Sequence, residues 1–215
     1  MPPPFDLLPA LLRGARVTVE LTLLGAALAL VLSFVVGFAR LSRFRLIRLT
    51  ATIYVEVLRG TSLLVQLFWI YFALPLWGIN LSAMTAGVLA IGLNHGAYGS
   101  EIVRSAILAV PRGQTEAAVA LNMTPVQRMT RVILPQAIPI MLPAFGNTLI
   151  ELLKSTSLVS LITLADLTFQ GTSLRTTTLR TTEIFSLLLI LYFLLAYPLT
   201  LGVRWLERKF AVGRG

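Results

Sequence analysis

The sequence contains no cysteine and a single histidine, His95. A chain without cysteine forms no disulfide, no thiolate metal site and no cysteine nucleophile. One histidine does not make a histidine-rich metal centre, and a catalytic serine–histidine pair would depend on His95 alone. We therefore expect no metal site and no catalytic residue in this chain.

Charge is also scarce. Charged residues make up 13% of the 215 residues, and hydrophobic residues make up 56%, whereas charged residues are roughly a quarter of a soluble domain. The mean hydropathy is +0.84. A membrane-spanning helix uses about 20 residues, so the chain has room for several spans and for no sizeable soluble domain.

Five apolar runs are long enough to cross a bilayer. The sequence therefore predicts an all-α membrane protein with five transmembrane helices, forming a single domain over residues 1–215. The predicted spans cover about residues 17–39, 53–77, 81–108, 137–164 and 184–203.

Basic residues outnumber acidic ones by 18 to 9, which gives a formal net charge of +9. In a soluble protein this excess would suggest nucleic acid, but here it falls mainly between the apolar runs, as in cytoplasmic loops. Strict alternation of five spans puts twelve basic residues on one side of the membrane and four on the other. We predict an external amino terminus, a cytoplasmic carboxyl terminus and no nucleic-acid partner. The twelve are Arg40, Arg43, Arg45, Arg48, Arg104, Arg112, Arg128, Arg131, Arg204, Arg208, Lys209 and Arg214.

The connection over residues 110–135 has a helix-forming composition. Residues 116–121 favour one short helix, Asn122 interrupts it, and a second amphipathic piece is expected to end at Pro135. Two short helices across the cytoplasmic face would suit docking to a soluble partner or an interfacial position on membrane lipid.

Ionisable residues inside a span cost several kcal/mol and need a partner, a wet cavity or a function. Glu151 and Lys154 are three residues apart and share a helical face. The hydroxyls of Ser155, Thr156 and Ser157 follow them. Together these groups complement a zwitterion, with lysine toward a carboxylate and glutamate toward an amine. Alternatively, the two charges neutralise each other or bond to a partner chain.

The third run carries His95, Tyr98 and Glu101 at helical spacing. We predict that these three residues line the substrate pathway, although a histidine is more often a packed residue than a ligand. Asp166 is expected at the outer mouth of the pathway. The polar run over residues 171–183 is expected outside the membrane, either as a solvated loop or as a contact for a binding protein.

The segment GQTEAAVALNMTPVQRMTRVILPQA resembles the EAA motif of the membrane subunits of ABC importers. The matching positions are Glu116, Ala117, Ala118, Val132, Leu134 and Pro135. Asn122 stands where that family usually has glycine, and asparagine tolerates left-handed backbone angles, so we expect the turn to persist. The resemblance implies a coupling helix that docks on an ATPase, with Gly113, Glu116, Ala117, Ala118, Asn122 and Pro135 at the contact.

Three further segments resemble the polar amino-acid uptake family of these permeases. They are RGTSLLVQLFWIYFALP from Arg59, HGAYGSEIVRSAILAVPRGQTEAA from His95 and NTLIELLKSTSLVSLI from Asn147. The family implies the type I ABC importer permease fold and a translocation pathway for a polar amino acid or related small zwitterion in the bacterial cytoplasmic (inner) membrane. Its partners would be an ABC ATPase dimer, a second permease subunit and an extracytoplasmic substrate-binding protein.

No GxxxxGK[ST] loop is present in the sequence. We therefore expect no cofactor in this chain, and we expect ATP and magnesium to be bound by the partner ATPase.

The sequence leaves three alternatives to amino-acid import. The segment ELLKSTSLVSLITLADLTF also resembles the ectoine and hydroxyectoine branch, so the same transporter class importing a compatible solute is the first alternative. An intramembrane serine protease would need a Gly-x-Ser-Gly string, and residues 59–63 lack the second glycine. An ion-coupled secondary transporter usually has a longer chain with internal repeats.

Overall fold

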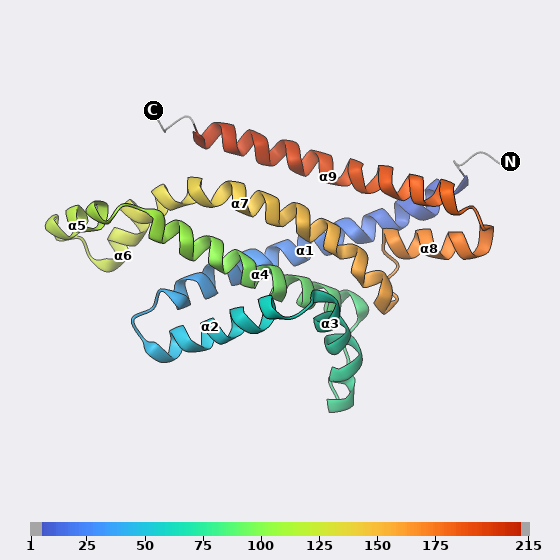
Figure 1. Cartoon of the computed structure of the whole chain (residues 1–215), viewed down its shortest axis with the longest axis horizontal. Helices are drawn as coiled ribbons and strands as arrows, with labels where there is room; N and C mark the ends of the chain where they lie inside the picture. The colour runs from blue at the N-terminus through green and yellow to red at the C-terminus, as the bar shows by residue number, and fades with distance from the viewer. Residues whose placement is uncertain (1–5, 212–215) are drawn as a thin grey trace.

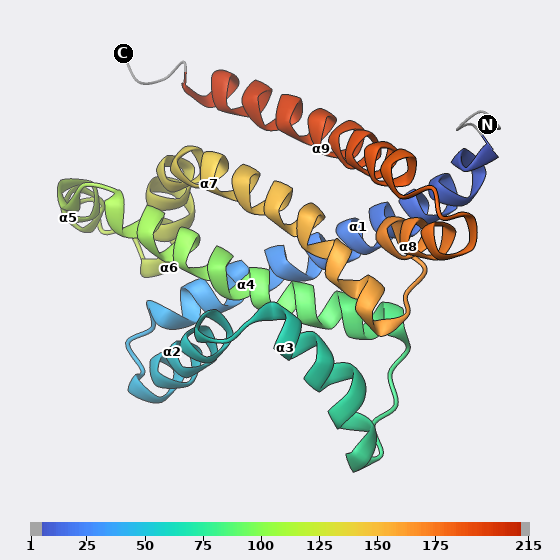
Figure 2. The same cartoon turned by 45° about the vertical axis from the view of Figure 1, so that its right-hand side comes forward.

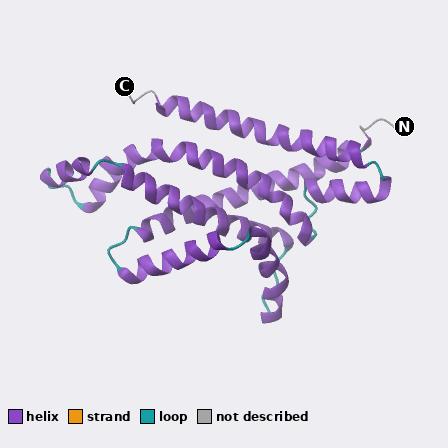
Figure 3. Ribbon diagram, in the orientation of Figure 1, coloured by secondary structure: helices purple, strands orange, loops and turns teal. Residues whose placement is uncertain are grey.

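The structure is a computed structural model that describes residues 6–211, and every regular element within that range is helical (Figure 3). Most of the chain lies in long helices, with short 3-10 and π-helical stretches (η) between them. The elements are α1 (Leu8–Arg40), α2 (Arg45–Gly60), α3 (Leu63–Phe68), η2 (Trp69–Ala73), η3 (Leu74–Trp77), α4 (Ala83–Ala109), α5 (Arg112–Ala120), α6 (Pro125–Arg128), η4 (Met129–Ile133), α7 (Leu134–Ser155), η5 (Thr156–Ile162), α8 (Leu167–Thr178) and α9 (Thr181–Ala211).

Three helical stretches are long and apolar enough to cross a membrane by length and composition: α1, the run Pro125–Ile162, and α9 over Thr181–Lys209. A fourth arises if α2 and the run Leu63–Trp77 form one span despite the bend of 104° between them. The third predicted span corresponds to α4, which has 27 residues but is not among these stretches. The all-helical class is confirmed, and the count of five spans stays a prediction.

Two expectations about continuity were wrong. The run over residues 53–77 is not one straight span, because the chain is extended at Thr61 and turns sharply before α3. The loop alternative for residues 171–183 was also wrong, because α8 continues to Thr178 and its threonine hydroxyls donate to carbonyls of the preceding turn. The position of this run outside the membrane stays a prediction.

The long helices run roughly along one direction, and the segment after the α2–α3 break projects away from them (Figures 1 and 2). One end of the molecule holds α5, α6, the α1–α2 connection and the last turns of α9. The other end holds α8 and the beginning of α1 (Figure 1). The basic residues between α1 and α2, those between α4 and α7, and those near the end of α9 therefore share one end of the molecule, as alternation requires. The side of the membrane on which that end lies stays a prediction.

Helices α1 and α4 pack closely because α4 presents glycines to α1. A Cβ atom added to Gly96 would lie 2.7 Å from Leu32 Cβ, and one added to Gly92 would lie 2.6 Å from Leu28 Cδ2. At Gly99 the added atom would lie 1.9 Å from Ser33 Oγ. Small residues let two helix backbones approach in a membrane, where no hydrophobic effect drives the helices together.

Asp166 begins α8 and is fully buried, with 0% exposure. Its Oδ1 accepts the Phe169 N–H at 2.8 Å, and the next backbone N–H, of Leu167, donates to Thr18 Oγ1 on α1 at 3.1 Å. Burial raises the pKa of Asp166 from 3.8 to about 6, and the hydrogen bonds that it accepts offset only part of that rise. Asp166 therefore anchors α8 against α1 instead of lying open at a mouth.

The glycine contact predicts a matched pair of variants. Gly96→Ala should lower the free energy of unfolding by about 1–3 kcal/mol, because the added methyl group overpacks the α1–α4 contact. Gly202→Ala on α9, where an added Cβ meets no atom within 4 Å, should leave stability unchanged or raise it by up to about 1 kcal/mol. Thermal denaturation of the purified protein measures both, and equal melting temperatures would contradict the packing role.

Asp166 predicts a pH dependence of stability. Because its pKa rises from 3.8 to about 6 on folding, the folded state binds the proton more tightly, and stability falls as pH rises from about 4 to about 6. The fall is worth up to about 3 kcal/mol. Asp166→Asn keeps a helix-capping oxygen without the charge. The variant should melt above the wild type at pH 7, and the difference should vanish near pH 4. A constant difference across this range would contradict the assignment.

Candidate functional site

A cavity of about 490 Å³ lies where the α2–α3 break, α4 and the end of α7 meet. Five predicted pathway residues line it: His95 and Tyr98 from α4, and Glu151, Lys154 and Ser155 from α7. The helices bring these side chains together although the two groups are about fifty positions apart in the sequence. The full lining is Thr61, Ser62, Leu63, Asn94, His95, Tyr98, Glu151, Lys154, Ser155 and Leu158.

The charges of Glu151 and Lys154 are not joined to each other. Among residues 6–211, neither side chain has a hydrogen bond or an ion pair with another protein group. The Ser155 hydroxyl donates to the backbone oxygen of Glu151 at 2.8 Å, which leaves the carboxylate itself uncommitted. A carboxylate and an ammonium group therefore face one cavity with their hydrogen-bonding capacity unused.

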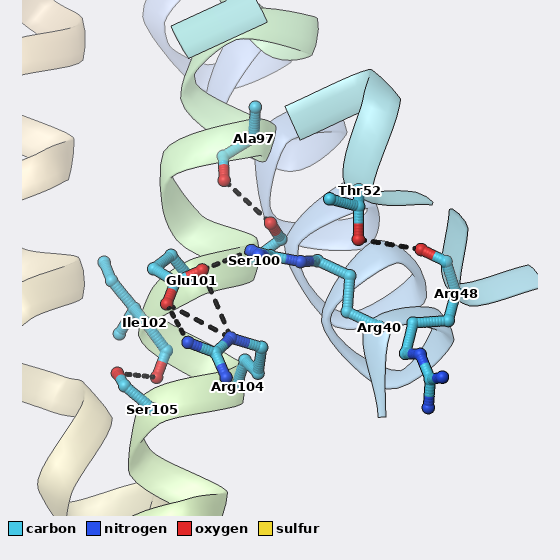
Figure 4. Close-up of polar contacts among 9 residues, drawn as sticks. All are labelled: Arg40, Arg48, Thr52, Ala97, Ser100, Glu101, Ile102, Arg104 and Ser105. Atoms are coloured by element: carbon cyan, nitrogen blue, oxygen red, sulfur yellow. Dashed lines mark hydrogen bonds and ion pairs between the residues drawn. The ribbon is translucent and has the colours of Figure 1, made fainter. Parts of the chain in front are cut away.

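Three predicted pathway residues lie elsewhere. Glu101 forms ion pairs with Arg40 at the end of α1 and with Arg104 on α4 (Figure 4). Thr156 is fully buried and donates to the Leu153 carbonyl at 2.7 Å. Ser157 lines a separate groove between α7 and α9. The spacing along the sequence predicted that Glu101 would line the pathway with His95. Glu101 instead pairs with Arg40, at the end of α1.

The residues at the α2–α3 break were not predicted as site residues from the sequence. Where α2 ends, the Leu58 carbonyl has no helical donor, and it accepts from Gln66 Nε2 at 2.8 Å and from Asn94 Nδ2 at 3.0 Å. Gln66 Nε2 also donates to Thr61 Oγ1 at 2.7 Å. A bilayer offers no water to an open carbonyl, so such a break requires these side chains. The polar string Arg-Gly-Thr-Ser at residues 59–62, inside an apolar run, was the available signal.

Arg59 ends α2 and lies over the ring of Tyr98, with 5.1 Å between its guanidinium carbon and the ring centroid. A cation at this distance is attracted by the face of the aromatic ring. The pair thus holds the Arg59 charge against the ring of Tyr98, which lines the cavity.

A second candidate site is α5, which directly follows the carboxyl-terminal end of α4. Gly113, Glu116 and Ala117 are exposed, and Ala118 is buried. The Glu116 carboxylate has no protein partner within residues 6–211. Exposed apolar side chains follow at Val119, Leu121 and Val126. An exposed acid beside exposed aliphatic groups is typical of a surface that another protein covers.

The turn expected at Asn122 is confirmed. Asn122 has a φ of 54°. Its N–H donates to the Val119 carbonyl at 2.9 Å, and the Met123 N–H donates to the Ala118 carbonyl at 3.1 Å. This pair of bonds closes the helix in a Schellman motif, in which the residue in the left-handed region is usually glycine. Asn122 thus holds a left-handed position of the kind that glycine usually fills.

The second helix of this connection was expected to end at Pro135, but it continues past that residue. It starts at α6, where Thr124 and Gln127 form a capping box, and passes through the π-helical turn η4 into α7. Pro135 sits in the first turn of α7, where its missing N–H is tolerated because the preceding turn is π-helical.

No group of three or more histidine or acidic residues close enough to hold a metal ion occurs within the described range. The candidate sites are therefore a charged cavity without a metal cluster and an exposed helix at one end of the molecule.

Comparison with known proteins gives consistent matches over nearly the whole chain. The model of the family described as "Binding-protein-dependent transport system inner membrane component" matches residues 29–212. The probable amino-acid ABC transporter permease protein y4tF of Sinorhizobium fredii is 48% identical, over 98% of this chain and 91% of that permease. The glutamine transport system permease protein GlnP of Escherichia coli K12 is 37% identical, over 95% of this chain and 94% of that protein.

A solved structure agrees with the sequence matches. The crystal structure of an amino acid ABC transporter with histidines superimposes with a TM-score of 0.89 at 38% identity, covering 95% of this chain and 96% of that one. The fold is therefore that of the type I ABC importer permeases.

Proposed function

The chain belongs to the family of binding-protein-dependent transport system inner membrane components and is a permease subunit of an amino-acid ABC importer; we propose that its charged cavity is where a polar amino acid or related small zwitterion crosses. The protein is a multi-pass inner-membrane transport subunit and not an enzyme, and ATP hydrolysis belongs to a separate subunit.

One observation carries the proposal for the cavity. Glu151 and Lys154 both line it, and neither is paired with another protein group within the described residues. Both residues are exposed in the single subunit, and a charge inside a membrane-spanning helix is costly unless a ligand, water or a partner chain meets it. A zwitterion satisfies both at once, with its carboxylate at Lys154 and its amine at Glu151.

We also propose that α5 is the coupling helix. Its exposed Glu116 and the aliphatic groups Val119 and Leu121 offer a mixed polar and apolar surface, and the Schellman turn at Asn122 gives the segment a defined shape. In this proposal α5 seats in an ATPase subunit, and Gly113, Ala117, Ala118 and Pro135 help to form or support the contact. A rigid helix at the end of α4 would transmit ATPase movement toward the cavity.

The assembly proposed around this subunit has three further components. They are an ATPase dimer that binds ATP and magnesium, a second permease subunit, and an extracytoplasmic substrate-binding protein. The end of the molecule that holds α5 and the basic segments faces the cytoplasm, as the positive-inside rule favours, and the amino terminus lies outside.

The cavity proposal predicts a loss of uptake with a matched control. Lys154→Ala and Glu151→Ala should each lower ATP-dependent amino-acid uptake at least about tenfold, since a charge-assisted hydrogen bond is worth about 1.5–3 kcal/mol. Glu207→Ala and Lys209→Ala on α9, outside the cavity, should retain uptake. Uptake of labelled amino acids into cells expressing the complete transporter measures this, and normal uptake in both cavity variants at normal membrane levels would contradict the proposal.

The coupling proposal predicts a different defect. Glu116→Ala should abolish uptake and reduce the ATPase recovered with the permease on purification, while the protein still inserts in the membrane. Co-purification and uptake are measured on the same membranes, with Glu207→Ala as the control. A Glu116→Ala permease that retains both would remove α5 from the coupling contact.

A further inference from the structure

We propose that the cavity recognises a primary ammonium group through three hydrogen-bond acceptors, Asn94, His95 and Glu151, and that Gln66 is a positioning residue that orients Asn94. This inference rests on the proposed function and specifies the substrate class. It selects amino acids with a free amine over N-methylated amino acids, betaines and cyclic amidines such as ectoine.

The Asn94 side chain is held in one orientation. Its Nδ2 donates to the Leu58 carbonyl at 3.0 Å and to Gln66 Oε1 at 3.1 Å. Both partners are acceptors only, so both N–H groups of the amide are in use. Asn94 is only 5% exposed and lines the cavity. The polar atom that remains for a ligand is therefore Oδ1, which is an acceptor.

The His95 ring also has one of its two nitrogens committed to the protein. Its Nδ1 lies 3.1 Å from the Ile91 carbonyl oxygen, and a carbonyl only accepts, so Nδ1 carries the proton. In the neutral ring Nε2 then bears a lone pair. His95 is 6% exposed and lines the cavity beside Asn94. Its free nitrogen is a second acceptor.

Glu151 supplies the third acceptor, since its carboxylate has no donor among the described residues. A primary ammonium has three N–H donors and one positive charge, which matches three acceptors of which one is anionic. A protonated cyclic amidine has two N–H groups, and a trimethylammonium group has none. Each missing N–H leaves one acceptor of the cavity without a partner, and the penalty is largest at Asn94 and His95, which are buried.

Gln66 is not among the residues that line the cavity, yet it determines what Asn94 presents there. Gln66 Nε2 is committed to Leu58 and Thr61, so Oε1 is the atom turned to Asn94. Without that acceptor one Asn94 N–H loses its partner, and the amide is free to turn and present a donor to the ligand. An ammonium would then meet a donor in place of an acceptor.

The first test measures binding to the purified permease–ATPase complex in lipid nanodiscs, without any binding protein, at about pH 8, where imidazole is neutral. The probes are the common L-amino acids, then the N-methyl, N,N-dimethyl and N,N,N-trimethyl derivatives of the tightest binder, and ectoine. We expect affinity to fall with each methyl group and by at least about tenfold for the trimethyl compound. Equal affinity for the trimethyl compound or for ectoine would overturn the inference.

The second test uses the ratio of affinities for the primary and trimethyl compounds. Gln66→Ala and Asn94→Ala should each lower this ratio at least about threefold, whereas a general packing defect would weaken both compounds alike and leave the ratio unchanged. Gln170→Ala, a half-buried glutamine on α8 outside the cavity, serves as the matched control.

The outcomes distinguish a failure of the proposed function from a failure of the ammonium site alone. If none of the amino acids binds and the complete transporter shows no ATP-dependent amino-acid uptake, the proposed function fails and the inference fails with it. If amino acids bind but the ratio is near one, or is unaltered in both Gln66→Ala and Asn94→Ala, only the inference fails.

Discussion

The close approach of α1 and α4 is the constraint on which the rest of the molecule depends. Gly92, Gly96 and Gly99 leave no room for a Cβ against α1, so the two backbones meet along one face of α4. The remaining faces of α4 are then available for function. Asn94 and Tyr98 line the cavity, and Glu101 joins α4 to Arg40 at the end of α1 (Figure 4).

The second requirement is that no backbone group stays unpaired where water is absent. The chain leaves the helical path between α2 and α3, and amide side chains replace the missing backbone donors. The same break supplies Thr61 and Ser62 to the cavity wall. A broken helix in a membrane protein is tolerated where it lines a cavity, so the fold defect and the candidate site are one feature.

Much of the architecture followed from composition and local chemistry. An apolar, weakly charged chain predicts membrane helices, and the helical class was confirmed. Asn122 was expected to adopt the turn of the EAA motif because a short amide side chain tolerates left-handed angles, and it does. Periodicity was less informative for side chains. Glu101 shares a helical spacing with His95 and Tyr98, yet it pairs with two arginines, because α1 ends beside it. Hydropathy alone did not reveal the break after Gly60, since apolar residues lie on both sides of it.

The sequence by itself determined that the chain is helical, that Glu151 and Lys154 share a helical face, and that the short helix before Asn122 ends in a turn at that residue. These are local properties, decided by spacing along one helix or by the chemistry of a few neighbouring residues. Only the tertiary structure decided which polar groups meet. Packing of α4 against α7 brought His95 and Tyr98 to Glu151 and Lys154, and hydrogen bonds between residues 28 positions apart oriented Asn94 through Gln66. Such contacts depend on how helices cross, and crossing is set by side-chain volume and backbone satisfaction over the whole bundle rather than by any one segment.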